Sequence, residues 1–309
     1  MGEARRHDPA EELASLPAAR SPQVESVGSG PSLAGRVILV ITSPGVEESG
    51  YLEKVAALAQ FSGARLRLVD CSNQVASFDL PLARLKQRAR HLGRMLDRPV
   101  ETVDAEIRTR EALREQVEDC ALVCIARSAR AWHPGPRERD LLRTLIALRA
   151  RPVLVMGSGK LRGQGGYASS LVPVSLGPNS PELLAWARGL APQAWLEVLH
   201  VTEIQEHTRR STWGALHRRL RALAGGQDEG ARGVTHTLAH GVVPDVIGRR
   251  HIGERHDLVV VGIGSRKRWL PWPTLAQYLA RWLNGDVLVI PQSPGQDNTP
   301  FKGQWGFWT

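Results

Sequence analysis

The chain has 309 residues, of which 42% are hydrophobic and 23% are charged, as in a globular protein of about two domains. No stretch approaches the roughly 18 consecutive apolar residues of a membrane span, and we expect no secretory signal because no apolar segment follows the N-terminus. The formal net charge is +9, but only five of the 40 cationic residues are lysine. Such an arginine excess can reflect base composition, so it is weak evidence for an anionic partner.

Three cysteines, Cys71, Cys120 and Cys124, form an odd and sparse set that favours a reducing compartment. We therefore expect a cytoplasmic protein. Cys120 and Cys124 fall four residues apart on a predicted strand, too far apart for a disulfide, and we interpret them as small buried core residues.

The first half of the chain alternates short apolar runs with segments of helical periodicity. Residues 1–34 are rich in Pro, Gly, Ser and charged residues and predict a disordered tail. Residues 35–157 predict a first domain, in which Thr109 is the N-cap of a helix. The predicted strands are 36–41, 64–69, 100–107, 121–126 and 152–156, and the predicted helices are 47–61, 82–96, 109–118 and 137–148.

The same order of elements returns after a glycine-rich linker, residues 158–167. Residues 168–292 predict a second domain, and 293–309 form a C-terminal tail. In this half Ser180 and Pro181 predict the N-cap and first residue of a helix. The predicted strands are 171–176, 195–201, 234–240, 258–261 and 287–290, and the predicted helices are 180–190, 205–223, 244–256 and 274–283.

The two halves read as an internal duplication. RPVLVM at residues 151–156 and GDVLVI at 285–290 are 134 residues apart, and CALVCIA at 120–126 corresponds to DLVVVG at 257–262. Alternating strands and helices predict an α/β protein with two tandem Rossmann-like domains, each a five-stranded parallel sheet with helices on both faces. We expect the halves to pack as an intramolecular pseudo-dimer with approximate twofold symmetry.

The chain resembles the UspA-like universal stress protein family, with two Usp domains in tandem. The most specific segment is HGVVPDVIGRRHIGERHDLVVVG, residues 240–262, which is similar to the family's third helix and fourth strand. VLHVTE, residues 198–203, is similar to its second strand. The resemblance covers residues 168–292 well and 36–156 weakly. It implies domains like the adenine nucleotide alpha hydrolases, sheet order 3-2-1-4-5, pairing through the fifth strands, and further homodimers as an open possibility.

Many members of the family bind ATP between an Asp after strand one and a glycine loop after strand four. The family pattern after strand four is Gly, two residues, Gly, nine residues, then Gly and Ser or Thr. Glycine amides and a helix N-terminus suit phosphate oxygens. The resemblance places nucleotide contacts in the second half at six positions: Ser175, Val201, Gly262, Gly264, Ser265 and Thr274.

The sequence departs from this pattern in both halves. Thr42 and Ser175 stand where the Asp is expected, and Pro273 precedes Thr274 where the last glycine belongs. In the first half, the acidic residue of Arg139–Asp140 falls where Gly–Ser/Thr would bind phosphate. No nucleophile elbow, Ser-His-Asp order or carboxylate pair indicates a catalytic site.

We therefore expect a non-enzymatic universal stress protein that acts as a regulatory interaction scaffold in stress response, with its nucleotide sites largely lost and no bound cofactor. Two alternatives stay open. One is an ATP or nucleotide sensor acting through the second domain, with a weak ATPase activity not excluded by the sequence. The other is a basic protein associated with nucleic acid.

Several charged groups admit a second interpretation. Residues 266–268, Arg-Lys-Arg, are either an anion site or a solvated loop. The basic helices around 84–94 and 209–221 lack interleaved aromatics and a recognition motif, so solvated faces are favoured over nucleic-acid binding. Four histidines have a spacing that fits no common metal motif, so no metal site is expected: His236, His240, His251 and His256. His200, a fifth histidine, is expected to have a packing role.

The C-terminal tail is unusually aromatic. Four of the ten residues from Pro300 to Thr309 are Phe or Trp, in a chain that is 5% aromatic. The tail is expected either to fold back onto its own domain, near Trp269 and Trp272, or to anchor a protein partner.

Overall fold

The structure, a computed structural model, describes most of both halves. The described residues are 31–42, 48–70, 79–103, 109–127, 136–157, 159, 161–163, 166–202, 210–225, 233–263 and 274–291. The predictions for residues 1–30, for Cys71, for the 266–268 cluster with Trp269 and Trp272, and for the aromatic tail therefore lie outside the described residues.

The first half forms the alternating elements that its apolar runs predict. Every residue of its first strand is buried, which explains the continuous apolar run there. The elements are β1 (Val37–Thr42), α2 (Glu48–Ser62), β2 (Arg65–Asp70), α3 (Asp79–Leu96), β3 (Glu101–Val103), α4 (Arg110–Glu118), β4 (Leu122–Ala126), α5 (Pro136–Leu148) and β5 (Val153–Met156).

The second half repeats this order, ending in a strand that is also buried throughout. Its elements are β6 (Ser169–Pro173), α6 (Ser180–Leu190), β7 (Trp195–Thr202), α7 (Arg210–Ala224), β8 (Val234–His240), α8 (Val243–Gly253), β9 (Leu258–Gly262), α9 (Leu275–Trp282) and β10 (Asp286–Ile290).

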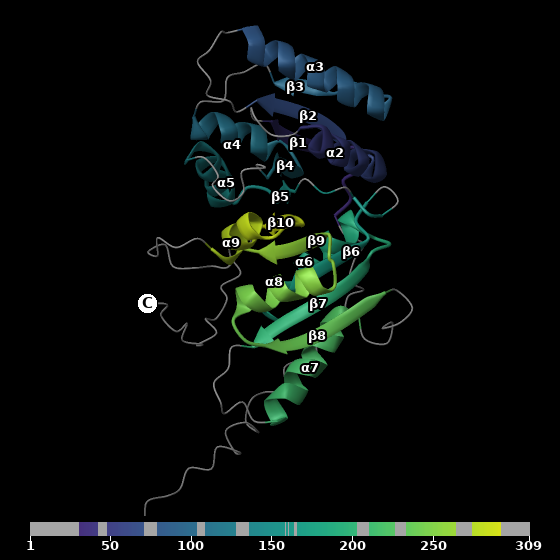
Figure 1. Ribbon diagram of the computed structural model, residues 1–309, viewed down its shortest axis with the longest axis vertical. Coiled ribbons are helices and arrows are strands. Elements are labelled where there is room, and N and C mark those ends of the chain that lie inside the picture. The colour runs from purple at the N-terminus through teal and green to yellow at the C-terminus, as the bar shows by residue number, and fades with distance from the viewer. Residues whose placement is uncertain are drawn as a thin grey trace, which may run out of the picture.

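All ten strands join in one sheet, in the order β3-β2-β1-β4-β5-β10-β9-β6-β7-β8 (Figure 1). Within each half the neighbouring strands are parallel. The halves meet where β5 and β10 pair antiparallel, with Leu154 opposite Leu288. This arrangement confirms the predicted fold class, the order 3-2-1-4-5 in each half, and the pairing through the fifth strands.

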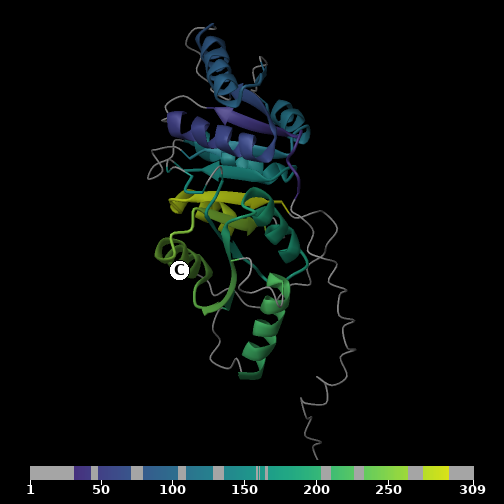
Figure 2. The same ribbon diagram turned by 90° about the vertical axis from the view of Figure 1, so that its right-hand side faces the viewer.

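Helices cover the two faces of the sheet in separate layers. The apolar side chains of α2, α3, α6 and α7 pack on one face, around residues such as Val40, Leu154 and Val260. Those of α4, α5, α8 and α9 pack on the other, around Leu39 and Val287. The yellow strand β10 lies beside the teal strands of the first half in Figure 2, so the two halves form one continuous body.

Helix starts show one confirmed prediction and one correction. Thr109 is the N-cap of α4, because its Oγ1 accepts the Ala112 N–H at 3.1 Å. Ser180 is not an N-cap: Asn179 is the cap of α6, and Ser180 is the buried first residue of the helix. The helix starts at residue 180 as predicted, but the cap was placed one residue late, because Pro181 occupies the second helical position, whose N–H also lacks a partner within the helix.

Two element ends fall three residues short of the prediction, and in each case a residue in the left-handed conformation follows within the predicted range. The strand expected at 171–176 ends at Pro173, and Leu176 has φ 58°. The helix expected at 244–256 ends at Gly253, and Arg255 has φ 55°. Such a turn is not visible in the side-chain periodicity when the residue is not glycine.

One residue of the predicted tail and one of the predicted linker are buried. Leu33, assigned to the N-terminal tail, is 4% exposed in the core. Tyr167, assigned to the linker, is also 4% exposed and hydrogen-bonded to a carboxylate. Each of these large side chains stands between two small residues, so the average composition of the segment does not reveal that it is buried.

The two described cysteines lie in the core as free thiols. Burial raises the pKa of the Cys120 thiol to about 11 and that of Cys124 further. Neither thiol is therefore poised as a nucleophile.

Candidate functional site

The carboxyl ends of β6 and β9 are where the resemblance places a nucleotide, and these strands are neighbours in the sheet. Gly262 ends β9, and Ser175 lies exposed two residues beyond β6. Val201 is half-buried at the end of the adjacent β7. The structure thus brings these three residues to one edge of the sheet, whereas Gly264 and Ser265 lie outside the described residues.

Thr274, the sixth predicted contact, caps α9. Its Oγ1 accepts the Gln277 N–H at 3.3 Å, and the Gln277 Oε1 accepts the Thr274 N–H at 3.0 Å. This reciprocal capping box satisfies two of the amides at the start of the helix from within the chain. Those amides are the ones that the resemblance would offer to phosphate.

Apolar packing and an internal hydrogen bond flank the same edge of the sheet. Leu183 of α6 is buried so close to Gly262 that a Cβ there would lie 3.5 Å from the Leu183 Cδ2. His200 of β7 is buried, and its Nδ1 donates to the Val174 carbonyl at 2.8 Å. Burial lowers the pKa of His200, so the ring has a structural, neutral role.

In the first half, a buried tyrosine lies against the carboxyl ends of β1 and β4. Tyr51 of α2 is 3% exposed, and its hydroxyl lies 2.9 Å from the Cys124 carbonyl and 3.3 Å from that of Ile41. Thr42, which stands in place of the family's Asp, is buried and donates to the Val69 carbonyl at 3.2 Å. The Tyr51 and Thr42 hydroxyls are thus both hydrogen-bonded to backbone carbonyls at the ends of these strands.

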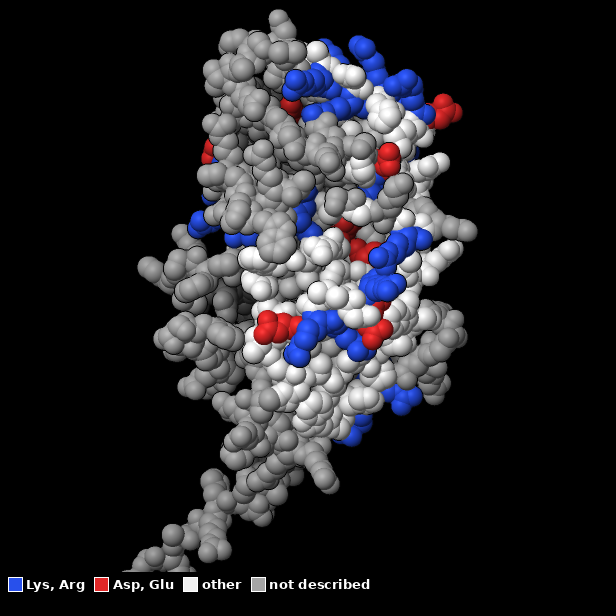
Figure 3. Space-filling model, viewed as in Figure 1, with Lys and Arg blue, Asp and Glu red and all other residues white. Residues whose placement is uncertain are grey.

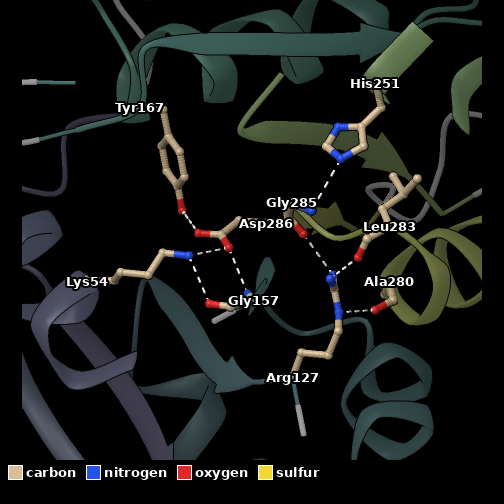
Figure 4. Close-up of polar contacts among 9 residues, drawn as sticks. All are labelled: Lys54, Arg127, Gly157, Tyr167, His251, Ala280, Leu283, Gly285 and Asp286. Atoms are coloured by element: carbon tan, nitrogen blue, oxygen red, sulfur yellow. Dashed lines mark hydrogen bonds and ion pairs between the residues drawn. The ribbon is translucent and has the colours of Figure 1, made fainter. Parts of the chain in front are cut away.

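The most developed polar cluster lies instead at the seam between the halves (Figure 4). Asp286, the first residue of β10, is 1% exposed, and its Oδ1 lies 2.6 Å from the Nζ of Lys54 on α2. The Gly157 N–H donates to the same oxygen at 2.8 Å, and the Tyr167 hydroxyl donates to Oδ2 at 2.8 Å. The Lys54 ammonium also donates to the Gly157 carbonyl at 3.0 Å.

These contacts make a closed network around one buried ion pair. Burial raises the pKa of the Asp286 carboxyl, against the opposing effects of Lys54, the Gly157 amide and Tyr167. Burial and the Asp286 carboxylate in turn raise the pKa of Tyr167 well above its ordinary value. The tyrosine therefore stays a donor to the carboxylate, and the network links the two halves through Lys54, Tyr167 and Asp286.

Beside this network, an arginine of the first half clamps the end of α9 in the second. Arg127 donates from Nε to the Ala280 carbonyl at 2.8 Å, from Nη2 to that of Gly285 at 2.9 Å, and from Nη1 to that of Leu283. Burial lowers the pKa of Arg127 to about 10, so it remains charged at neutral pH. A cation suits this place because it meets unpaired carbonyls at a helix C-terminus.

His251 of α8 approaches the same turn from within the second half. Its Nε2 accepts the Gly285 N–H at 3.2 Å, so the ring proton is on Nδ1. That Nδ1 is buried and has no hydrogen-bond partner among the described residues. Burial, with His256 and Arg127 nearby, lowers the pKa of His251 to about 4.

A second buried carboxylate, Glu197 in β7, lies within the second half and is fully covered. It accepts hydrogen bonds from Thr237 at 2.6 Å, from Arg250 at 2.7 Å and from the His256 Nε2 at 2.9 Å. Burial raises the pKa of Glu197, but these three donors outweigh it and hold the pKa below its ordinary value. The carboxylate is thus a charged structural anchor for β8 and α8.

The Glu197 cluster also contains a serine in hydrogen-bond order with the histidine. The Ser169 Oγ lies 2.7 Å from the His256 Nδ1, which gives a Ser–His–Glu chain. However, the N–H groups of Ala168 and Ser169 both donate to Asp257, at 2.9 Å each. These two amides are therefore engaged by a carboxylate and are not available to stabilise an oxyanion.

Sequence reasoning missed the residues of both clusters because the partners come from distant segments. A signal existed for Lys54, a rare lysine placed on the apolar side of its helix beside Tyr51 and Val55. Nothing in the local sequence distinguishes Arg127 among 35 arginines, or Glu197 in its strand.

Two wider searches of the structure complete the description. Within the described ranges, no three His, Cys, Asp or Glu side chains are grouped so as to hold a metal ion. No helix in the described part of the chain is long and apolar enough to cross a lipid bilayer.

No protein-family model matches the sequence, and no curated protein does. Solved structures do match. A functionally unknown protein from Pseudomonas aeruginosa PAO1 is 20% identical, with a TM-score of 0.61 over 84% of this chain and 93% of that one. A candidate universal stress protein from P. aeruginosa UCBPP-PA14 is 21% identical, with a TM-score of 0.60 over 84% and 94%.

A universal stress protein from Archaeoglobus fulgidus DSM 4304 is 10% identical, with a TM-score of 0.60 over 85% of this chain and 98% of that one. Each of these three matches spans both halves of the chain. At such low identity they establish the fold, and the site must be argued from its own residues.

Proposed function

We propose that this chain, which has the fold of tandem universal stress proteins, is a non-enzymatic member of that family and acts through protein contacts in stress regulation. The observation that carries the proposal is the capping box of α9. Thr274 and Gln277 satisfy each other's amides at 3.0 and 3.3 Å, where a nucleotide-binding relative would present them to phosphate.

The first half supports the same proposal. The Tyr51 hydroxyl is hydrogen-bonded to the Cys124 carbonyl of β4, and the Thr42 hydroxyl to the Val69 carbonyl, so both groups are engaged within the chain. The free, buried thiols of Cys120 and Cys124 are consistent with the cytoplasm as the place of action.

The helix layer that contains α8 and α9 offers a surface for protein contacts. Tyr278 and Trp282 of α9 are 37% and 58% exposed, with ring centroids 6.1 Å apart. Ile252, on the neighbouring helix α8, is 72% exposed. Exposed aromatic and aliphatic side chains of this size are typical of binding surfaces, although singly they also occur on ordinary ones.

The test is native mass spectrometry of freshly purified protein, with calorimetric titration of ATP, ADP and AMP. We expect no co-purified nucleotide and no heat of binding. Micromolar binding that is lost in Gly264→Asp, but kept in Gly253→Asp at a site with open space around it, would overturn the proposal. The second half would then be a nucleotide sensor.

A further inference from the structure

The positive charge of the chain is concentrated in two helices at equivalent places in the two halves. α3 and α7 each follow the second strand of their half. α3 has five Lys or Arg and one acid, and α7 has four Arg and no acid, so each carries +4 against +9 for the whole chain. The other described helices lie between −1 and +1.

The net charge of α3 and α7 comes from their shortage of acids, because arginine is also present in other helices. α4 has two Arg and three acids, and α5 has three Arg and two acids, so the charges of these helices nearly cancel. A bias toward arginine alone would not deplete α3 and α7 of acids. The helix that follows the second strand is strongly basic in both halves. The sequence alone favoured solvated faces for these helices, and it is the three-dimensional placement that supports a binding role.

α3 presents its cations to solvent along one side. Its apolar side chains Leu85, Ala89 and Leu92 are buried against the sheet. The exposed cations include Lys86, Arg90 and Arg94, which repeat every four residues, or about 6 Å along the helix. Figure 3 shows Lys and Arg gathered at the end of the molecule where α3 lies.

The C-terminal end of α3 is also hollowed. A shallow depression there is lined by Arg90, Arg94 and Arg98 together with Gln87, Gly93, Asp97 and Pro99, so three cations face one acid. Gly93 lets the chain turn back on the helix, because a Cβ there would lie 3.2 Å from the Arg98 carbonyl oxygen.

α7 repeats this arrangement at the other end of the sheet. Leu220 and Ala224 are buried against the same face of the sheet that α3 covers. His217, Arg218, Arg219 and Arg221 are exposed. α3 and α7 lie at opposite ends of the long axis in Figure 1.

We propose that the exposed faces of α3 and α7 bind duplex nucleic acid through its phosphates, independently of base sequence. A duplex carries one charge for about every 1.7 Å of its length, which suits a row of cations along a rigid helix. The planar guanidinium group of arginine can also donate two parallel hydrogen bonds to phosphate oxygens.

Two other polyanions fit the surface less well. An anionic membrane is bound by helices whose apolar side inserts among the lipids, but Leu85 and Leu92 of α3 already lie in the core. Single strands are bound by exposed aromatic platforms, but α3 contains no Phe, Tyr or Trp, and Trp213, the one aromatic of this kind in α7, is half-buried.

The proposal is tested with a fluorescein-labelled 25-base-pair DNA of random sequence and the full-length chain. We expect anisotropy titrations to give micromolar binding at 100 mM salt, with log K falling linearly as log salt rises. The variant Arg84→Gln/Arg90→Gln/Arg94→Gln should lose at least tenfold in affinity and reduce the salt slope by about 2 to 3. Arg218→Gln/Arg221→Gln should give a smaller loss of the same kind.

The matched control is Arg110→Gln/Arg114→Gln/Arg143→Gln, which changes the net charge equally at exposed positions on α4 and α5. It should stay within about twofold of the unaltered chain. Equal losses in the two triple variants, or no binding by the unaltered chain, would overturn the proposal. So would binding to vesicles containing phosphatidylserine in place of the duplex, which would assign the surface to membranes.

Discussion

At the scale of single residues, Gly285 is the most constrained position of the seam. Its N–H donates to the His251 Nε2, and its carbonyl accepts a hydrogen bond from the Arg127 Nη2. A Cβ built on Gly285 would lie 2.4 Å from the His251 Cε1 and 3.3 Å from the Asp257 carbonyl oxygen. Glycine is required here because His251 and the Asp257 backbone approach it closely from two sides. From the sequence alone, a glycine just before a strand indicates only a turn.

We predict that Gly285→Ala lowers the free energy of unfolding by about 2 kcal/mol, because the imidazole must move and both hydrogen bonds are distorted. Urea denaturation measures this change. The control is Gly248→Ala in α8, where a Cβ meets nothing within 4 Å and helix propensity favours Ala by up to about 1 kcal/mol. Equal effects of the two substitutions would contradict the packing argument.

His251 predicts a pH dependence of stability. Its folded pKa of about 4 lies below the ordinary value of 6.5, so its contribution is fully present above pH 6.5 and is lost as the pH falls toward 4. The loss is on the order of 2 kcal/mol, because a charged imidazolium cannot accept the Gly285 N–H and lies near Arg127.

Unfolding curves at pH 7.5, 6 and 5 test this expectation. His251→Gln retains an acceptor but cannot titrate, so its stability should change less over this range than that of the unaltered chain. His91→Gln, at an exposed position on α3, should leave the pH dependence unchanged. A steep decline that persists in His251→Gln would assign it to another group.

At the scale of elements, α9 combines a cap at one end with a clamp at the other. The Thr274–Gln277 capping box fixes its start, and Arg127 binds the carbonyls at its end. The helix has eight residues, too few for stability on its own. Its position therefore depends on these end contacts and on its buried residues Ala276, Leu279 and Ala280.

We predict that Thr274→Ala lowers the free energy of unfolding by about 1 kcal/mol through loss of the cap, whereas Thr274→Ser preserves most of it. Thermal or urea unfolding distinguishes them. If Thr274→Ala and Thr274→Ser were equally stable, the hydroxyl would have no capping role in solution.

The elements were the most predictable part of this molecule. Buried strands such as β4 and β10 are continuous apolar runs, and amphipathic helices such as α3 repeat at helical spacing, so both were visible in the sequence. What the sequence concealed depends on three-dimensional proximity. Lys54 and Asp286 are 232 residues apart, and Glu197 and His256 are 59 apart, so no local pattern could pair them.

At the scale of the whole molecule, the seam joins unlike residues from the two halves. Lys54 belongs to the first half and Asp286 to the second, and the pair is 6% and 1% exposed. A buried charge left without its partner is costly, so each half requires the other.

We predict that Lys54→Met alone and Asp286→Asn alone each cost about 3 to 5 kcal/mol of unfolding free energy, because each leaves one charge buried and unpaired. The double variant should cost clearly less than the two single changes added together. Additive losses would show that the two groups are energetically independent.

The exposed pair of Arg65 and Glu101 provides the comparison. Its side chains are 59% and 44% exposed and lie 3.4 Å apart. Arg65→Met should cost less than about 1 kcal/mol, because solvent screens such pairs.

The antiparallel contact of β5 and β10 has a consequence for how the protein responds to dilution. Separate subunits that meet along a strand edge fall apart when their concentration drops below the dissociation constant. Here the two edges belong to one polypeptide, and the 12 residues between β5 and β6, 157–168, hold them at an effective concentration of roughly millimolar. The ten-stranded sheet therefore persists at any abundance the cell maintains, including the lowest.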